Sequence, residues 1–256
     1  MAVLTATTAG TDAGAEPARA AGARRRVAWL DAARGVAIVA MVLYHGSFDL
    51  LFFGYVDWPV TSHPLWRAFA AGIASTFLFL VGVSLVAAHG NGIRWRPFLK
   101  RLAWVVAGAA AVTIGTAFAM PMPIYFGILH AIALFSVLAL PFVRAPVALT
   151  AAVAAVVFVL PHVWRDALFY APWAYPFGLA PHMPVTFDYE PIFPWFAVTL
   201  LGVVAGRLVR LVPGEKPVGP VWRRIAVLGR WSFPIYLLHQ PVLFGALMGI
   251  AMLTRP

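Results

Sequence analysis

The segment from Trp29 to Phe53 limits what this chain can fold into more than any other feature. It is long and apolar enough to cross a membrane as a helix, yet it contains Asp31, Arg34, His45 and Asp49. At about 100° per residue, the two aspartates fall at the same position around the helix and the other two residues lie to one side. Ionisable groups inside a membrane are costly unless they pair with neighbouring helices or line an enclosed cavity. The pattern therefore indicates chemistry or transport within the bilayer.

The remainder of the chain has the composition of a membrane protein. Of its 256 residues, 62% are hydrophobic and only 11% are charged, far from the average of soluble domains. Further apolar runs occupy residues 65–88, 97–119, 124–143, 146–163, 192–212 and 231–253. We therefore predict an all-α fold, a polytopic membrane helix bundle of about seven transmembrane helices. Residues 1–25 are predicted to be a disordered cytoplasmic tail and residues 26–256 a single domain.

Charge patterning predicts the orientation of the bundle. Most lysines and arginines fall in alternate loops, on the same side as the amino terminus, so the positive-inside rule places that terminus in the cytoplasm. We expect a multi-pass protein of the cell membrane, the inner membrane of a bacterium. The formal net charge of +10 is explained by this topology, and no nucleic-acid partner is predicted. The chain contains no cysteine, which excludes disulfides and thiolate chemistry, and no ligand spacing predicts a metal site.

The best catalytic candidates are His45 and Asp49. They are four residues apart and share a helix face, so the carboxylate can hold the imidazole in one tautomer, as a general base requires. The alternative is a helix-end pair that only satisfies itself near the headgroups. His130 is the third candidate, and a structural histidine bonded to a neighbouring helix explains it equally well.

Other polar residues are expected at two depths of the bundle. An outer vestibule would gather Asp57, His63, Arg67, His130, Asp188 and Glu190. The alternative for Asp57 and His63 is a solvated position in the loop. Within it, Arg67 would bind an anionic group or extend its side chain to the membrane surface. His239 and Gln240 would lie nearer the cytoplasmic half of the last helix and line a pore or link helices.

Four stretches together resemble a known family. They are residues 26–45 (RVAWLDAARGVAIVAMVLYH), 126–130 (FGILH), 189–196 (YEPIFPWF) and 232–241 (SFPIYLLHQP). In this order they resemble the bacterial heparan-α-glucosaminide N-acetyltransferase-like membrane proteins, over about residues 24–250. The resemblance also extends to the wider transmembrane acyltransferase group, in which an Arg-Gly pair early in the first helix precedes an intramembrane histidine.

The resemblance implies transfer of an acetyl or other acyl group from cytoplasmic acyl-CoA to an acceptor beyond the membrane. The partners would be acetyl-CoA as donor, an extracytoplasmic glycan or glycolipid as acceptor, and the lipid bilayer. Arg34 would contact the donor while Asp31 restrains its side chain. His45 would deprotonate the acceptor amine or hydroxyl, or would itself accept the acyl group. The implied assignment is catalysis by His45, Asp49 and His130, donor binding by Asp31, Arg34, His239 and Gln240, and acceptor binding by Arg67 and Glu190.

Transport is the main alternative function. A bundle with intramembrane ionisable groups can move a proton-coupled solute or flip a lipid. Inverted internal repeats and paired Gly/Pro-interrupted helices are the pattern expected of such transporters, and we find neither in the sequence. A non-catalytic membrane subunit would leave the charged stripe of the first helix without a purpose.

Overall fold

A computed structural model describes residues 27–119, 123–182, 184, 186–209 and 219–254 of the chain, and the predicted tail, residues 1–25, lies outside these ranges. Within them the fold is helical, and one isolated parallel bridge joins Phe126 to Tyr189. The α-helices are α2 (Ala28–Phe52), α3 (Pro64–His89), α4 (Trp95–Ala119), α5 (Ile128–Leu138), α6 (Val147–Val163), α7 (Ile192–Leu208), α8 (Pro220–Arg230) and α9 (Ser232–Thr254). Three short 3-10 helices are η1 (Pro141–Val143), η2 (Ala167–Tyr170) and η3 (Pro172–Phe177). The predicted all-α class is confirmed.

Helices occupy all the apolar runs found in the sequence, but they differ in length. The four helices α2, α3, α4 and α9 are long and apolar enough to cross a membrane, and α5, α6 and α7 are shorter apolar helices. The run 124–143 shows the largest difference, because only 11 of its residues form α5. Such a helix is about 16 Å long, well short of a hydrocarbon core of about 30 Å. The residues before it leave the helix to pair with the loop that precedes α7.

The main hydrophobic core lies among α3, α5, α6 and α7. Its largest fully buried side chains include Leu78, Phe135 and Leu200. Helices α3 and α7 approach so closely that a Cβ atom added to Gly82 would lie 2.1 Å from the carbonyl oxygen of Thr199. Small residues that allow such backbone contact are a common means of helix association in membranes.

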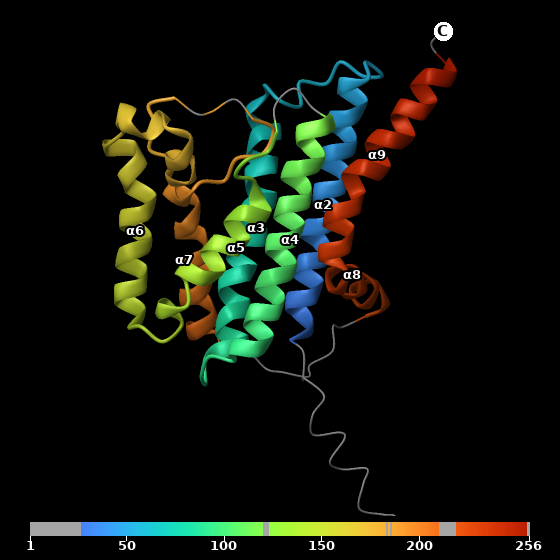
Figure 1. The fold of residues 1–256 in the computed structure, drawn as a ribbon. Helices are drawn as coiled ribbons and strands as arrows, with labels where there is room; N and C mark the ends of the chain where they lie inside the picture. Colours follow the sequence, from blue (N-terminus) through green and yellow to red (C-terminus); the bar gives the residue numbers. More distant parts are fainter. Residues whose placement is uncertain (1–26, 120–122, 183, 185, 210–218, 255–256) are drawn as a thin grey trace, which may run out of the picture.

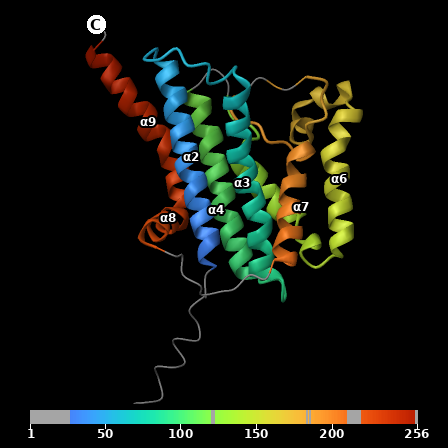
Figure 2. The same cartoon turned by 180° about the vertical axis from the view of Figure 1, so that it is seen from behind.

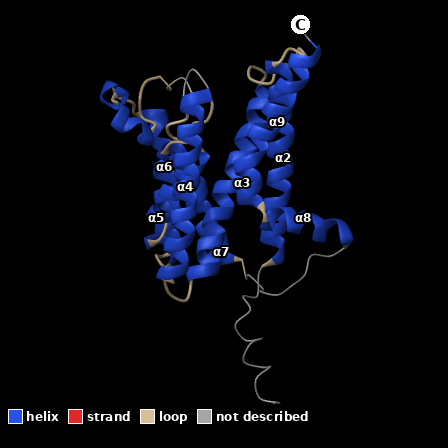
Figure 3. Ribbon diagram, turned by 45° about the vertical axis from the view of Figure 1, so that its right-hand side comes forward, coloured by secondary structure: helices blue, strands red, loops and turns tan. Residues whose placement is uncertain are grey.

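Helix α2 packs between α3, α9 and the short helix α8. Figures 1 and 2 show α8 lying across the end of the bundle at which α2 begins, roughly at right angles to the long helices. Figure 3 shows α2, α8 and α9 together on one side of the molecule, with α5 and α6 on the other. Sequence reasoning assigned residues 220–230 to a basic loop, because this segment is too polar to be an apolar span.

The Pro-rich segment between α6 and α7 covers one end of these two helices (Figure 1). It contains η2 and η3, and Asp166 caps η2 by accepting a hydrogen bond from the Leu168 amide at 2.8 Å. The sequence predicts a capping loop with a short helix around residues 164–170, and η2 falls inside that stretch. The following residues, 186–191, enter the bundle and bring carboxylates to it.

Candidate functional site

The four ionisable residues of α2, Asp31, Arg34, His45 and Asp49, form a polar stripe along the helix. The stripe begins with an ion pair near the start of α2. Arg34 donates from Nη1 to Asp31 Oδ1 at 2.9 Å and from Nη2 to Ser84 Oγ of α3 at 2.6 Å. Asp31 is buried, and Ser84 in turn donates to the carbonyl oxygen of Leu80. Helix α3 therefore fixes the guanidinium orientation together with the aspartate. The predicted restraint of Arg34 by Asp31 is present in the structure.

The other half of the stripe contacts α9. Gln240 donates from Nε2 to Asp49 Oδ1 at 2.7 Å, and the rings of His45 and His239 lie with their centroids 4.9 Å apart. Along the axis of α2, His45 lies about 16 Å from Arg34, because the two residues are 11 positions apart. The structure therefore groups His239 and Gln240 with His45 and Asp49, whereas the sequence analysis placed them at a different depth.

Asp49 does not orient His45 in the way that the four-residue spacing predicts. Its side chain is completely buried at the contact with α9, where Oδ1 accepts the hydrogen bond from Gln240 and Oδ2 has no hydrogen-bond partner. The carboxylate faces α9 because α2 and α9 pack along this side of the helix. Across the α2–α9 interface, the two imidazoles therefore contact each other and the Asp49 carboxylate bonds to the Gln240 amide.

The proton on His239 can be placed from its hydrogen bonds. Its Nδ1 lies 2.7 Å from the carbonyl oxygen of Tyr236, which can only accept, so Nδ1 carries a hydrogen. Its Nε2 is buried and has no hydrogen-bond partner. In the neutral imidazole this nitrogen has a free lone pair, which makes it a potential proton acceptor.

His130 is held by α4 near the start of α5. Thr113 Oγ1 donates to the carbonyl oxygen of Ile124 at 2.6 Å, so the same oxygen accepts from Nε2 of His130 at 3.1 Å. This bond fixes the His130 ring against a neighbouring helix. It matches the structural explanation that the sequence left open, and Nδ1 remains the nitrogen for any further role.

Two carboxylates reach the site from the loop before α7. Asp188 Oδ2 accepts a hydrogen bond from the Ile128 amide at 3.0 Å and so caps the start of α5, while the Glu190 amide donates to the Phe126 carbonyl oxygen at 3.2 Å. Asp188 lies within electrostatic range of His45, His130 and Tyr236, the last on α9. This loop therefore connects the polar residues of α2 and α9 with His130 of α5. We call these groups, together with Asp188 and Glu190, the polar cluster.

Glu190 occupies an environment that favours its protonated form. Burial raises the pKa of its carboxyl group well above the ordinary value of 4.5, and the neighbouring Asp188 raises it further through its charge and a side-chain hydrogen bond. Oε2 of Glu190 is buried without a hydrogen-bond partner. Next to it, burial raises the pKa of Tyr189 to about 12, and this phenol donates to the Tyr175 carbonyl oxygen at 2.7 Å.

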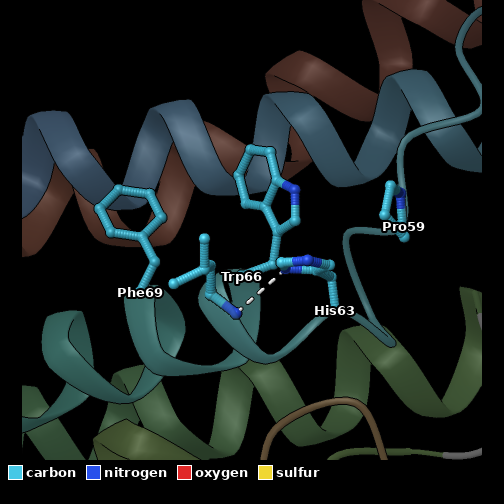
Figure 4. A pocket seen from close by; sticks show the side chains of 5 residues that line it. Pro59, His63, Trp66 and Phe69 are labelled. Atoms are coloured by element: carbon cyan, nitrogen blue, oxygen red, sulfur yellow. Dashed lines mark hydrogen bonds between the residues drawn. The ribbon is translucent and has the colours of Figure 1, made fainter.

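Arg67 stands apart from these groups. It is exposed near the start of α3, one residue after Trp66, in a region that also forms an open apolar hollow of about 480 Å³. Pro59, His63, Leu65, Trp66 and Phe69 line the hollow (Figure 4). His63 accepts the Leu65 amide hydrogen at Nδ1, 3.2 Å away, and so caps α3. The structure does not bring Arg67 or His63 into the polar cluster.

Three contributors to the site were missed by sequence reasoning: Ser84, Thr113 and Tyr236. Serine and threonine inside apolar helices carry little signal, because their hydroxyls commonly bond to the carbonyl of the preceding turn. Tyr236 lies in the stretch 232–241 that resembles the family, but an uncharged tyrosine in an apolar helix does not indicate a polar site. Among the described residues, no group of three histidines, aspartates or glutamates is placed to hold a metal ion.

The apolar helices and the buried polar cluster define the class of protein. This is a multi-pass membrane protein in which histidines, carboxylates and an amide from α2, α5, α9 and the loop before α7 gather inside the bundle. Such intramembrane groups mark sites of proton or group transfer.

Comparison with known families gives the particular assignment. Residues 26–241 match the family described as heparan-alpha-glucosaminide N-acetyltransferase, catalytic. The chain belongs to this family, which confirms the resemblance drawn from the four motifs and indicates a membrane enzyme of the acetyltransferase type. No curated protein and no solved structure matches the chain significantly.

Proposed function

We propose that this protein transfers an acetyl group from cytoplasmic acetyl-CoA to a sugar amine or hydroxyl on the outer side of the membrane. In this proposal the catalytic pair is His45 and His239. The family resemblance alone implied that His239 binds the donor. The observation that carries the proposal is the contact of the two imidazoles between α2 and α9, with Nε2 of His239 buried and unpartnered.

A neutral histidine with its proton on Nδ1 is suited to general-base catalysis. Nε2 of His239 takes the proton from the acceptor, whose nitrogen or oxygen attacks the thioester carbonyl carbon. The new C–N or C–O bond forms, the C–S bond breaks, and the imidazolium returns its proton to the departing thiolate. In the alternative two-step route an imidazole attacks first and carries the acetyl group before the acceptor takes it.

Neighbouring side chains position this pair. The Gln240–Asp49 hydrogen bond fixes the register of α9 against α2, and the Tyr236 carbonyl oxygen orients the His239 ring. Asp188 lies within electrostatic range of His45, and a carboxylate so placed stabilises an imidazolium while the proton is in transit. His130, secured by Thr113, lines the same cluster from α5.

The donor site is at the Arg34 end of the stripe. Asp31 and Ser84 hold the guanidinium in a fixed orientation, and a guanidinium is a strong donor to phosphate oxygens. The arginines of the same end attract a polyanionic coenzyme. The thioester arm then extends along α2 toward His45, and Glu190 and Arg67 remain candidates for contact with the acceptor.

The membrane setting completes the proposal. Residues 26–256 form one domain with seven spans in the bacterial inner membrane, the amino terminus in the cytoplasm. The described basic residues support this orientation, because those near the start of α4, the α5–α6 turn, the end of α7 and α8 share one end of the bundle (Figure 1). The acceptor would be a glycan or glycolipid at the opposite end.

The test is acetyl transfer by the purified protein in proteoliposomes, with labelled acetyl-CoA and a mixture of hexosamine acceptors. We expect His45→Gln and His239→Gln each to lower the rate by about 10²- to 10⁴-fold. His162→Gln, at an exposed histidine on α6, is the matched control and should be fully active. Acid quenching before the acceptor is added would reveal acetylated protein on the two-step route.

Two results would contradict the proposal. Wild-type activity in a folded His239→Gln variant would remove His239 from the catalytic pair. If the wild-type protein neither binds nor consumes acetyl-CoA with any acceptor, the enzyme assignment fails and a proton-coupled transporter or lipid flippase becomes the leading function.

A further inference from the structure

Helix α8 contributes no side chain to the proposed catalytic pair or to the bonds that hold Arg34, yet it carries both basic and large apolar residues on its surface. It lies across the end of the bundle at the start of α2 (Figures 1 and 3). Its three arginines are all exposed, and so are the large apolar residues Val221, Trp222, Val227 and Leu228. Trp231, 62% exposed, follows directly and leads into α9.

The residues of α8 divide into three faces. At about 100° per residue, Arg223 and Arg230 share one side, while Val221 and Leu228 share the opposite side. The exposed residues Arg224 and Val227 lie between these two sides, on the side away from α2. Val221 is 63% exposed and Leu228 38%. The third face is turned toward α2: a Cβ added to Gly229 would lie 1.7 Å from the Asp31 carbonyl oxygen. One face is therefore occupied by protein, and the apolar and basic faces are both uncovered.

The contact with α2 fixes the direction of these faces. A Cβ added to Gly35 would lie 2.0 Å from the Ile225 carbonyl oxygen, so the two backbones touch at a second point. The helix consequently cannot rotate about its own axis without separating from α2. Its arginines and its exposed apolar residues keep a constant orientation relative to the long helices that cross the membrane.

We propose that α8 is an interfacial helix that binds anionic phospholipid headgroups of the leaflet at this end of the bundle. A helix perpendicular to the spans, apolar on one side, basic on the other and bounded by Trp222 and Trp231, has the properties of helices that lie in the headgroup layer. Its exposed charges in the described segment are all positive, so the complementary partner is a phosphate-bearing lipid surface. Contact with Asp31 and Gly35 links that lipid layer to the Arg34 region.

The experiment measures lipid retained by the full-length protein in detergent, by native mass spectrometry, after exposure to equimolar phosphatidylglycerol and phosphatidylcholine. The wild-type protein should retain phosphatidylglycerol preferentially. Replacing Arg223, Arg224 and Arg230 together by glutamine should weaken that preference by about tenfold or more. The same three positions changed to lysine should keep it, because the charge is retained.

A matched control removes the same charge elsewhere. Arg96, Arg144 and Arg207 are exposed outside α8, near the start of α4, in the α5–α6 turn and near the end of α7. Their joint replacement by glutamine should lower the preference by only about twofold, because they lie on separate elements and form no common basic surface. An equal loss in both triple variants would overturn the proposal, and so would an unchanged preference in the α8 variant. Displacement of phosphatidylglycerol by added coenzyme A would assign the arginines to a donor site instead.

If the triple variant does not fold, the single changes Arg223→Gln and Arg230→Gln give the answer, since each should lower the preference partially. No loss in either folded single variant would also overturn the proposal. The readout is bound lipid, so the result does not depend on whether the protein transfers acetyl groups.

Discussion

At the scale of single residues, the site combines polar groups that tie elements together with buried polar atoms that have no partner. Arg34 links α2 to α3, His130 links α5 to α4, and Asp188 ties the loop before α7 to the start of α5. In contrast, Asp49 Oδ2, Glu190 Oε2, His239 Nε2 and Gln240 Oε1 are buried without a partner. An unsatisfied buried polar atom costs about 1–3 kcal/mol. Four such atoms on the segments that form the cluster are consistent with a site shaped for a bound substrate.

The raised pKa of Glu190 gives a prediction for stability. The folded-state pKa of Glu190 lies well above the ordinary 4.5. Its contribution to the free energy of unfolding is therefore fully present below the unfolded-state pKa and is lost as the pH rises through the folded-state pKa. Glu190→Gln imitates the protonated form and cannot ionise. We expect this variant to unfold at a temperature that changes less between pH 5 and pH 9 than that of the wild-type protein.

Thermal unfolding in detergent across that pH range measures the effect. Asp166→Asn is a suitable control, because Asp166 lies in an exposed turn and its amide analogue should keep the wild-type pH profile. A Glu190→Gln profile that parallels the wild-type one at every pH would show that this carboxyl group does not govern the pH dependence.

At the scale of helices, the sequence predicted the positions of the apolar helices well, but it predicted poorly which helices contact each other. Apolar runs identified α2, α3 and α4 because continuous hydrophobicity reports burial in lipid directly. Helix α8 was missed because its signal is an amphipathic pattern in a short basic segment. The Gln240–Asp49 contact could not be predicted, since 191 residues separate the partners and no local pattern records which helices become neighbours.

Close contact between α3 and α7 gives a prediction at this scale. Gly82→Ala places a Cβ 2.1 Å from a backbone oxygen of α7 and must push the helices apart, at a cost of about 1–3 kcal/mol in the free energy of unfolding. Gly72→Ala is the control on the same helix, where the added Cβ meets nothing within 4 Å. This change should be neutral or stabilise by up to about 1 kcal/mol, because alanine favours helices over glycine.

Unfolding in mixed micelles of increasing denaturing detergent compares the two variants under identical conditions. Equal stability of Gly82→Ala and Gly72→Ala would mean that α3 and α7 do not rely on this contact. The comparison isolates packing from helix propensity, because both substitutions gain the same propensity and only one adds an atom at the interface.

At the scale of the whole molecule, the question is which end of the bundle faces the cytoplasm. The chain has no cysteine, so single-cysteine variants report their own side without background. We expect Asn91→Cys, in the α3–α4 turn, and Arg144→Cys, in the α5–α6 turn, to resist a membrane-impermeant maleimide in intact cells. Ser62→Cys, between α2 and α3, and Thr254→Cys, at the end of α9, should react. Positive charge near membrane helices favours the cytoplasmic side, which is the physical basis for this pattern.

The four positions together also test the number of crossings. With seven spans, α2 and α9 both run from the inside to the outside. Ser62→Cys and Thr254→Cys must then label alike, because six spans, an even number, lie between them: α3, α4, α5, α6, α7 and α9. Labelling of Asn91→Cys and Arg144→Cys only after permeabilisation would place the Arg34 end, α8 and their arginines in the cytoplasm, where acetyl-CoA is made. The opposite pattern would put the donor end outside, and a cytoplasmic acetyl donor could then not reach Arg34 from that side.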